Sequence, residues 1–313
     1  MGGLYVHFQC DTGIEAIPLL SAVRPQNTLA ERVEFCGRGM FHGIEARVAL
    51  LPAAFDTGIV FRRTDLPGSP PIRANCESVA REPRRTVLAA AENVRVETVE
   101  HLMSAMAGLH VDNCVVEISA PEVPGFDGSC RPFCDEILTA GTVAQDADVN
   151  SVVVSDVYTV RSRSRAQTLL LRPYLYSCLA MTYHLDYGRH NPLPPQTMSA
   201  EISPEFFYSE ISRARTFVLE SEISMLRKMG YGRHLTSRDL VVVGRDGIEG
   251  NVPRWPDEAV RHKILDCIGD LALAGTPICG HVTACRSGHH LNHGLAGVIE
   301  SLKKEQRCGR VAA

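Results

Sequence analysis

The chain has 313 residues, of which 45% are hydrophobic and 22% are charged, the composition of a globular protein large enough for two domains. Its formal net charge of −4 provides no global basic field, so we expect no nucleic-acid partner, and local Arg or Lys side chains would have to bind any anion. No run approaches the roughly 18–20 apolar residues that cross a bilayer. The eleven cysteines contain no CxxC pair, which favours reduced thiols. We therefore expect a cytoplasmic monomer with no stable membrane insertion.

The first half of the chain is predicted to mix strands with helices. Residues 1–22 match no clear period and are interpreted as an extension of uncertain order. Residues 46–52 and 58–63 are predicted to be strands, and β-branched residues at 113–119 predict a third. Apolar residues at helical spacing predict a helix at 98–109, and a short helix follows at 132–138.

The second half begins again with strands, after a polar stretch at 139–150 that is the best candidate for a domain boundary. Strands are predicted at 152–160, 168–172, 177–185 and 240–244, and the first helix of this half is predicted at 204–212. The clearest helix spans 257–274, because Pro256 and acidic residues open it and Gly275 closes it, and a strand follows at 279–284. Both halves favour an α+β class, with domains at 23–145 and 150–305, over an alternating parallel sheet.

Within the helix predicted at 257–274, His262, Asp266 and Asp270 are spaced by four and share one face. Imidazole and carboxylate are both suitable zinc ligands, and a catalytic zinc usually has three protein ligands. Glu100 and His101, near the start of the helix at 98–109, could add the third ligand and a general base for a water that zinc activates. Each pattern alone is more often a salt-bridged polar stripe or an ordinary helix start.

Two further patterns carry candidate chemistry. The loop expected at 287–290 holds His289 and His290, and His289 could act as an acid if Asp270 kept it protonated. A polar turn is the alternative, and for His290 we prefer it. Lys263 would project beside the polar stripe, a placement that suits contact with a phosphate or oxyanion, although most helix-surface lysines face water.

Six ordered segments extend this pattern over nearly the whole chain, from about Arg24 to Leu302. They read TVEHLMSA at 98–105, APE at 120–122, DGS at 127–129, SRARTF at 212–217, RHKILDCIGD at 261–270 and SGH at 287–289. Together these segments resemble the UDP-3-O-acyl-N-acetylglucosamine deacetylases, zinc enzymes of lipid A synthesis. The resemblance implies a cytoplasmic enzyme that removes the N-acetyl group from an acylated UDP-sugar.

The resemblance also implies a fold and a set of roles. The fold would be two similar α+β sandwich domains with helices packed between two sheets, an active site at their junction, and an inserted βαβ segment near 218–236 that forms an acyl passage. The implied roles are zinc ligation by His101, His262 and Asp266, general base catalysis by Glu100, acid catalysis by His289 with Asp270, oxyanion stabilisation by Thr216, and substrate contacts by Phe217, Lys263 and Arg286. The native metal could be zinc or iron.

Two departures from the family pattern stand out. In the turn at 39–43 the histidine, His42, is displaced by one position, so we assign it no role. Arg286 stands where a lysine is usual, which keeps the charge but replaces a compact ammonium with a planar fork. Two alternatives stay open: a zinc amidohydrolase for a different acylated sugar, and a non-catalytic metal- or lipid-sensing protein. Retention of Glu100 and His289 argues against the second.

Overall fold

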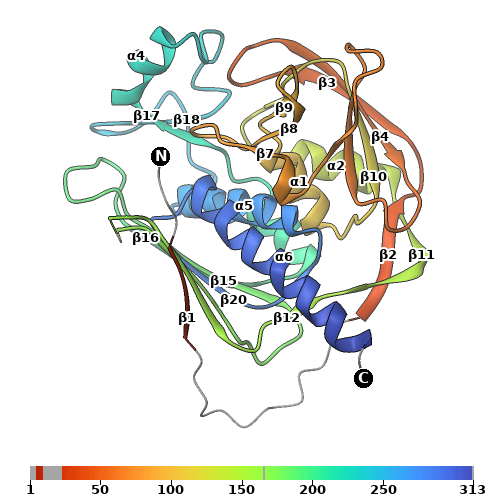
Figure 1. The fold of residues 1–313 in the computed structure, drawn as a ribbon. Coiled ribbons are helices and arrows are strands. Elements are labelled where there is room, and N and C mark those ends of the chain that lie inside the picture. The colour runs from red at the N-terminus through yellow and green to blue at the C-terminus, as the bar shows by residue number, and fades with distance from the viewer. Residues whose placement is uncertain (1–4, 10–22, 165, 312–313) are drawn as a thin grey trace.

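Two β-sheets lie on either side of a central layer of helices in the computed structural model, which describes residues 5–9, 23–164 and 166–311 (Figure 1). The first sheet has the order β3-β4-β10-β5-β6, and only the β10–β5 pair is parallel. Its strands are β3 (Val33–Arg38), β4 (Glu45–Pro52), β10 (Cys114–Ile118), β5 (Ile59–Arg63) and β6 (Ile72–Arg73). Alternate residues such as Ala46, Val48 and Leu50 are buried, so one face of this sheet packs on the core.

The second sheet has the order β1-β13-β14-β20-β15-β16, with β12 paired to β20. Its strands are β1 (Tyr5–Gln9), β13 (Val157–Arg161), β14 (Thr168–Arg172), β20 (Ile278–Cys285), β15 (Leu179–Leu185), β16 (Gln196–Ile202) and β12 (Val152–Val153). Strands β15 and β20 are parallel neighbours although about ninety residues separate them. The long crossover between them carries the helix α5 and the inserted strands described below.

The central layer is formed by α1 (Glu100–Gly108), α2 (Arg131–Ala140), α5 (Glu258–Leu271) and α6 (His289–Val311). Helix α5 is buried around nearly its whole circumference, with only Arg261 and Lys263 partly exposed. Gly269 explains how closely α5 approaches α1, because a Cβ atom there would lie 2.0 Å from the carbonyl oxygen of Glu100. This contact fixes the start of α1 against the last turn of α5.

A smaller three-stranded sheet projects from the crossover beside the helix α4 (Figure 1). It consists of β17 (Phe217–Leu219), β18 (Val241–Gly244) and β19 (Gly247–Glu249), and α4 spans Glu220–Lys228. Strands β17 and β18 are parallel, so β17, α4 and β18 form a βαβ unit. The remaining elements are β2 (Val23–Leu29), β7 (Val79–Ala80), β8 (Val87–Ala91), β9 (Val94–Glu97), β11 (Thr142–Asn150), α3 (Pro204–Phe206) and the short helices η1 (Cys76–Ser78), η2 (Phe207–Ile211) and η3 (Ala272–Ala274).

The predicted α+β class is confirmed, and most predicted elements lie within a few residues of their observed positions. Within the polar stretch 139–150, the candidate domain boundary, residues 142–150 form the strand β11, which pairs with β2. The domain limits themselves stay a prediction. Residues 5–9, within the predicted extension, form β1 on the edge of the second sheet, and the rest of that extension lies outside the described residues. The described part of the chain contains no helix long and apolar enough to cross a membrane.

Candidate active site

A cavity of about 1020 Å³ lies between the central helices and the βαβ insert. Nine of the ten residues proposed from the sequence line it: Glu100, His101, Thr216, Phe217, His262, Lys263, Asp266, Arg286 and His289. The tenth, Asp270, is fully buried behind His289. These residues come from segments as far apart as α1 and the start of α6, and the packing of α1 on α5 brings them together.

His101, His262 and Asp266 place their ligand atoms within 4.8 Å of one another, and all three side chains are buried. The Asp266 Oδ1 atom lies 3.2 Å from His262 Nε2 and 3.6 Å from His101 Nε2. Ligands about 2.0–2.1 Å from a tetrahedral zinc are separated by roughly 3.3 Å. The observed spacing therefore fits one metal ion held by two imidazole nitrogens and a carboxylate oxygen.

The tautomer of His262 supports the same fit. Its Nδ1 lies 3.0 Å from the carbonyl oxygen of Ala214, which can only accept, so Nδ1 carries the hydrogen. In the neutral ring Nε2 then presents a lone pair toward the Asp266 carboxylate, an arrangement that a cation between them would stabilise. A backbone carbonyl that fixes the ring of a metal-ligating histidine is a common outer-shell arrangement.

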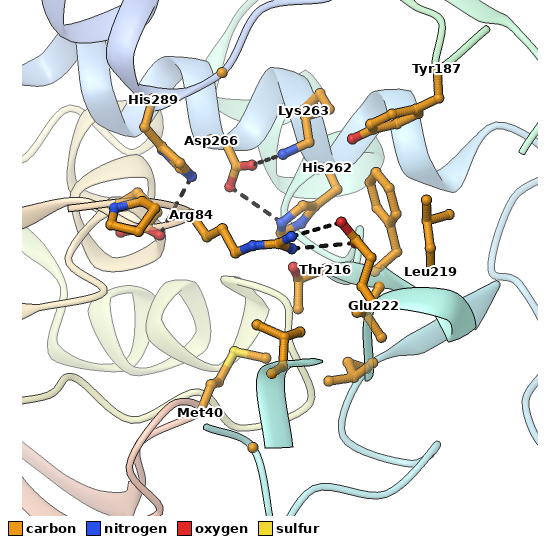
Figure 2. A pocket seen from close by; sticks show the side chains of 18 of the residues that line it. Met40, Arg84, Tyr187, Thr216, Leu219, Glu222, His262, Lys263, Asp266 and His289 are labelled. Atoms are coloured by element: carbon orange, nitrogen blue, oxygen red, sulfur yellow. Dashed lines mark hydrogen bonds and ion pairs between the residues drawn. The ribbon is translucent and has the colours of Figure 1, made fainter. Parts of the chain in front are cut away.

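Lys263 is more closely tied to the candidate metal site than the sequence suggested. Its Nζ donates to Asp266 Oδ2 at 2.7 Å and lies 5.6 Å from the centre of the Phe217 ring (Figure 2). Burial lowers the pKa of Lys263, but Asp266 outweighs that effect, and the net pKa lies above its usual value. The ammonium therefore stays charged and orients the second oxygen of Asp266 while it still lines the cavity.

Glu100 is buried beside the candidate metal site at the first position of α1. Its Oε2 accepts a hydrogen bond from the backbone N–H of Thr86 at 3.0 Å, and its Oε1 lies 3.9 Å from His289 Nε2. Burial raises the pKa of Glu100 above its ordinary value, and the neighbouring His289 and His101 only partly oppose this effect. A carboxylate held in this way is a stronger base than an exposed one.

His289 and His290 are the first two residues of α6, so the expectation of a loop at 287–290, and of a polar turn at His290, was wrong for both residues. For His289, the neighbouring contacts decide what it can do. Its Nδ1 lies 2.8 Å from Asp270 Oδ2. Burial lowers the pKa of His289, but Asp270 and then Glu100 outweigh it and raise the pKa to about 9. His289 is therefore protonated at neutral pH, and its Nε2 faces the Glu100 side of the cavity.

The remaining candidates surround this centre. The Phe217 ring lies 6.5 Å from the His262 ring and 6.1 Å from the Tyr187 ring, at the start of β17. The backbone N–H of Thr216 donates to the carbonyl of Gly128, which holds the backbone at this position, and the Thr216 side chain lies in the cavity wall (Figure 2). Arg286 already pairs with the carboxylate of Asp186. Any anion that Arg286 contacts therefore meets a partly neutralised guanidinium.

The apolar part of the cavity differs in detail from the expected acyl passage. Met225 and Met229, which lie in the segment 218–236 expected to form the passage, are 49% and 54% exposed and do not line the cavity. Apolar side chains that do line it include Met40, Val218, Leu219, Ile223, Leu226, Leu235, Leu240 and Val242. Met40, from the first half of the chain, packs with Leu240 and Val242 of the insert, so both halves contribute to this wall.

Sequence reasoning also missed an ion pair inside the cavity. Arg84, on the loop before β8, donates to Glu222 of α4 at 2.7 and 3.3 Å, and the pair spans the space between the first half of the chain and the insert (Figure 2). Arg84 has a φ of 69°, a conformation uncommon for residues other than glycine. No residue pattern near position 84 indicates such a contact, because its partner lies 138 residues away.

Comparison with known proteins identifies one family. The family model described as UDP-3-O-acyl N-acetylglycosamine deacetylase matches residues 26–301. Proteins named UDP-3-O-acyl-N-acetylglucosamine deacetylase are similar along most of their length: that of Myxococcus xanthus is 38% identical over 88% of this chain and 86% of its own. Those of Pseudomonas entomophila and Chromobacterium violaceum are 39% and 37% identical, each over 86% of this chain and 88% of its own.

Proposed function

The chain belongs to the UDP-3-O-acyl N-acetylglycosamine deacetylase family, and on this premise we propose that it hydrolyses the N-acetyl group of UDP-3-O-(3-hydroxyacyl)-N-acetylglucosamine in lipid A biosynthesis. The products are acetate and the free amine of the sugar. The observation that carries this proposal at the level of the site is the convergence of His101, His262 and Asp266 beside Glu100 and His289 in one cavity.

The metal that this donor set would hold is zinc, with iron(II) as the alternative in the cell. Two imidazole nitrogens and one carboxylate oxygen form a suitable set for either ion, and they leave room for water and substrate. When bound, the ion would supply Lewis acidity that polarises the acetyl carbonyl and lowers the pKa of water. Lys263 would hold the carboxylate of Asp266 in the ligating orientation.

Two side chains divide the proton transfers. Glu100 takes a proton from the water whose oxygen attacks the acetyl carbon, because its carboxylate is buried, raised in pKa and adjacent to the ligand His101. As the carbon–nitrogen bond breaks, protonated His289 gives its Nε2 proton to the departing nitrogen, and Asp270 holds the ring from the Nδ1 side. Glu100 Oε1 and His289 Nε2 lie 3.9 Å apart, close enough for both to reach the same scissile amide, which supports this division of roles.

The other cavity residues would bind and orient the substrate. The Thr216 side chain would stabilise the oxyanion that forms on the acetyl group, and Phe217 would pack against the sugar ring. Lys263 and Arg286 line the same cavity and would contact the diphosphate. The apolar wall built by Met40, β17, α4 and β18 would receive the acyl chain. The monomeric state and the cytoplasmic location expected from the sequence stay predictions.

A deacetylation assay on matched substrates tests this function. The metal-loaded protein should release acetate from the 3-O-acylated UDP-N-acetylglucosamine far faster than from UDP-N-acetylglucosamine that lacks the acyl chain, because only the former can fill the apolar wall. The acylated N-acetylglucosamine without its nucleotide separates this activity from that of an amidohydrolase for another acylated sugar. Metal binding without release of acetate from any of the three would instead support a sensing protein.

A further inference from the structure

The buried carboxylate of Asp270 has two histidine neighbours, of which the proposed mechanism uses only one. Its Oδ2 lies 2.8 Å from His289 Nδ1, and its Oδ1 lies 3.3 Å from His293 Nε2. The two histidines are four residues apart in α6, so both project from the same face of the helix toward α5. Asn292 also donates to Oδ2, at 2.8 Å.

Thr86 connects this carboxylate to the second histidine and to the proposed base. The fully buried Thr86 hydroxyl lies 2.5 Å from Asp270 Oδ1 and 2.9 Å from His293 Nε2. The backbone N–H of the same residue donates to Glu100 at 3.0 Å. One residue of the first half of the chain therefore contacts both the base and the partner of the acid.

The two partners of the Thr86 hydroxyl determine which nitrogen of His293 carries a proton. Burial raises the pKa of Asp270, but His289 and His293 outweigh it and hold the pKa well below its usual range, so the carboxylate is ionised and only accepts. The single hydroxyl hydrogen of Thr86 therefore goes to Asp270 Oδ1. The Thr86 oxygen can then only accept from His293, so His293 donates from Nε2, whether its ring is neutral or charged.

We propose that His293 is a positioning residue for the reaction, which shares the Asp270 carboxylate with His289 and so sets the pH range over which His289 keeps its proton. Thr86 donates to Asp270 Oδ1, and the single Nε2–H of His293 is shared between the Thr86 oxygen at 2.9 Å and Asp270 Oδ1 at 3.3 Å. Both contacts spread the negative charge of Asp270, which leaves less of it to stabilise the His289 imidazolium. The charged groups that act on His289 from the packed elements are Asp270 and Asp266 of α5 and Glu100 of α1. Of these three groups, His293 contacts only Asp270, so it weakens only the effect of Asp270 on His289. This inference rests on the proposed role of His289 as the acid.

The test is the pH dependence of kcat for the metal-loaded protein and three variants. His293→Leu removes the donor, so more charge remains for His289, and the basic limb should move to higher pH by about half a unit, a roughly threefold tighter hold on the proton. His293→Asn keeps a neutral donor and should restore the limb toward its original position. His184→Leu, on the exposed outer face of β15, is the matched control and should leave the limb unchanged.

The outcomes separate this inference from the function on which it rests. A basic limb in His293→Leu that coincides with that of the unmodified protein would overturn the inference alone. If His289→Ala leaves the basic limb of the unmodified protein in place, His289 is not the acid. That result would overturn both the proposed role of His289 and the inference on His293. Nitrogen-15 NMR of histidine-labelled protein gives a test without any variant: His293 should carry its proton on Nε2 at pH 8, and a bare Nε2 would contradict the proposal.

Discussion

Replacing Asp270 with asparagine tests how the protein keeps an imidazole protonated in a buried site. Asp270 is the main group that raises the pKa of His289 to about 9, from the ordinary histidine value of 6.5. The difference corresponds to roughly 3 kcal/mol of preference for the charged ring, at 1.36 kcal/mol for each pKa unit. Asparagine has nearly the same shape and can still accept from Nδ1, but it removes the negative charge.

The expected result follows from the sign of this shift. In Asp270→Asn the His289 pKa should fall toward 6.5 or below, because burial then acts against the charged ring with less opposition. With a pKa of about 6.5, roughly one ring in eleven is protonated at pH 7.5. Activity at pH 7.5 should therefore fall about tenfold through protonation alone, while the loss at pH 6 is much smaller.

The assay is kcat measured between pH 5 and pH 10, with metal content and thermal unfolding recorded for each protein. His289→Ala is the reference, since it should lose activity at all pH values and show no basic limb. A basic limb in Asp270→Asn that stays near pH 9, in a folded protein with full metal content, would refute the assignment of Asp270 as the group that holds His289 charged. The same shift predicts that the stabilising effect of the His289–Asp270 pair is complete below pH 6.5 and disappears as pH rises through about 9.

Three further predictions test other parts of the site. Glu100→Gln should retain its metal, because Glu100 is not among the three ligands, and lose about 10²–10⁴-fold in kcat, which metal analysis and turnover measure together; loss of the metal would count against its role as base. Shortening the acyl chain by four methylenes should raise the barrier in kcat/KM by up to about 3 kcal/mol, at about 0.8 kcal/mol for each buried methylene, and equal kcat/KM for both chains would contradict the apolar wall as acyl site. Gly269→Ala should lower the free energy of unfolding by more than about 1 kcal/mol and reduce kcat, because the new Cβ would lie 2.0 Å from the carbonyl oxygen of Glu100. Chemical denaturation and a turnover assay measure the two effects. An unfolding free energy and a kcat equal to those of the unmodified protein would show that α1 and α5 adjust freely.

The sequence predicted the helices and strands that have a clear apolar period or clear end signals. Helix α5 combines an acidic start, regular apolar residues and a closing glycine, and it lies where expected. The helix α6 was missed because the Ser287-Gly288-His289-His290 segment, which leads into it and forms its first two residues, has the composition of a turn. Strand β11 was missed because its alternating polar residues lie in a two-stranded ribbon with β2, where little is buried.

The candidate residues could be found because ligands four residues apart on one helix leave a pattern in the sequence. Contacts between distant segments leave none, so nothing near Thr86 or Arg84 indicated that they would meet Asp270 and Glu222. Hydrophobicity likewise did not predict which side chains would face the cavity. Met225 and Met229 belong to the segment expected to form the acyl passage, yet Met225 lies on the exposed face of α4 and Met229 just after its end. Which face of a short helix is buried depends on its packing partner, here the wall that includes Met40.

The metal content and coordination of the protein test the central claim most directly. X-ray absorption of the zinc-loaded protein should show one ion per chain with only nitrogen and oxygen ligands at about 2.0–2.1 Å, two of them imidazoles. His262→Ala should lose the ion under conditions in which Glu100→Gln retains it. Sulfur at about 2.3 Å, the distance expected for a cysteine ligand such as the buried Cys267, or full metal content in His262→Ala, would contradict the account.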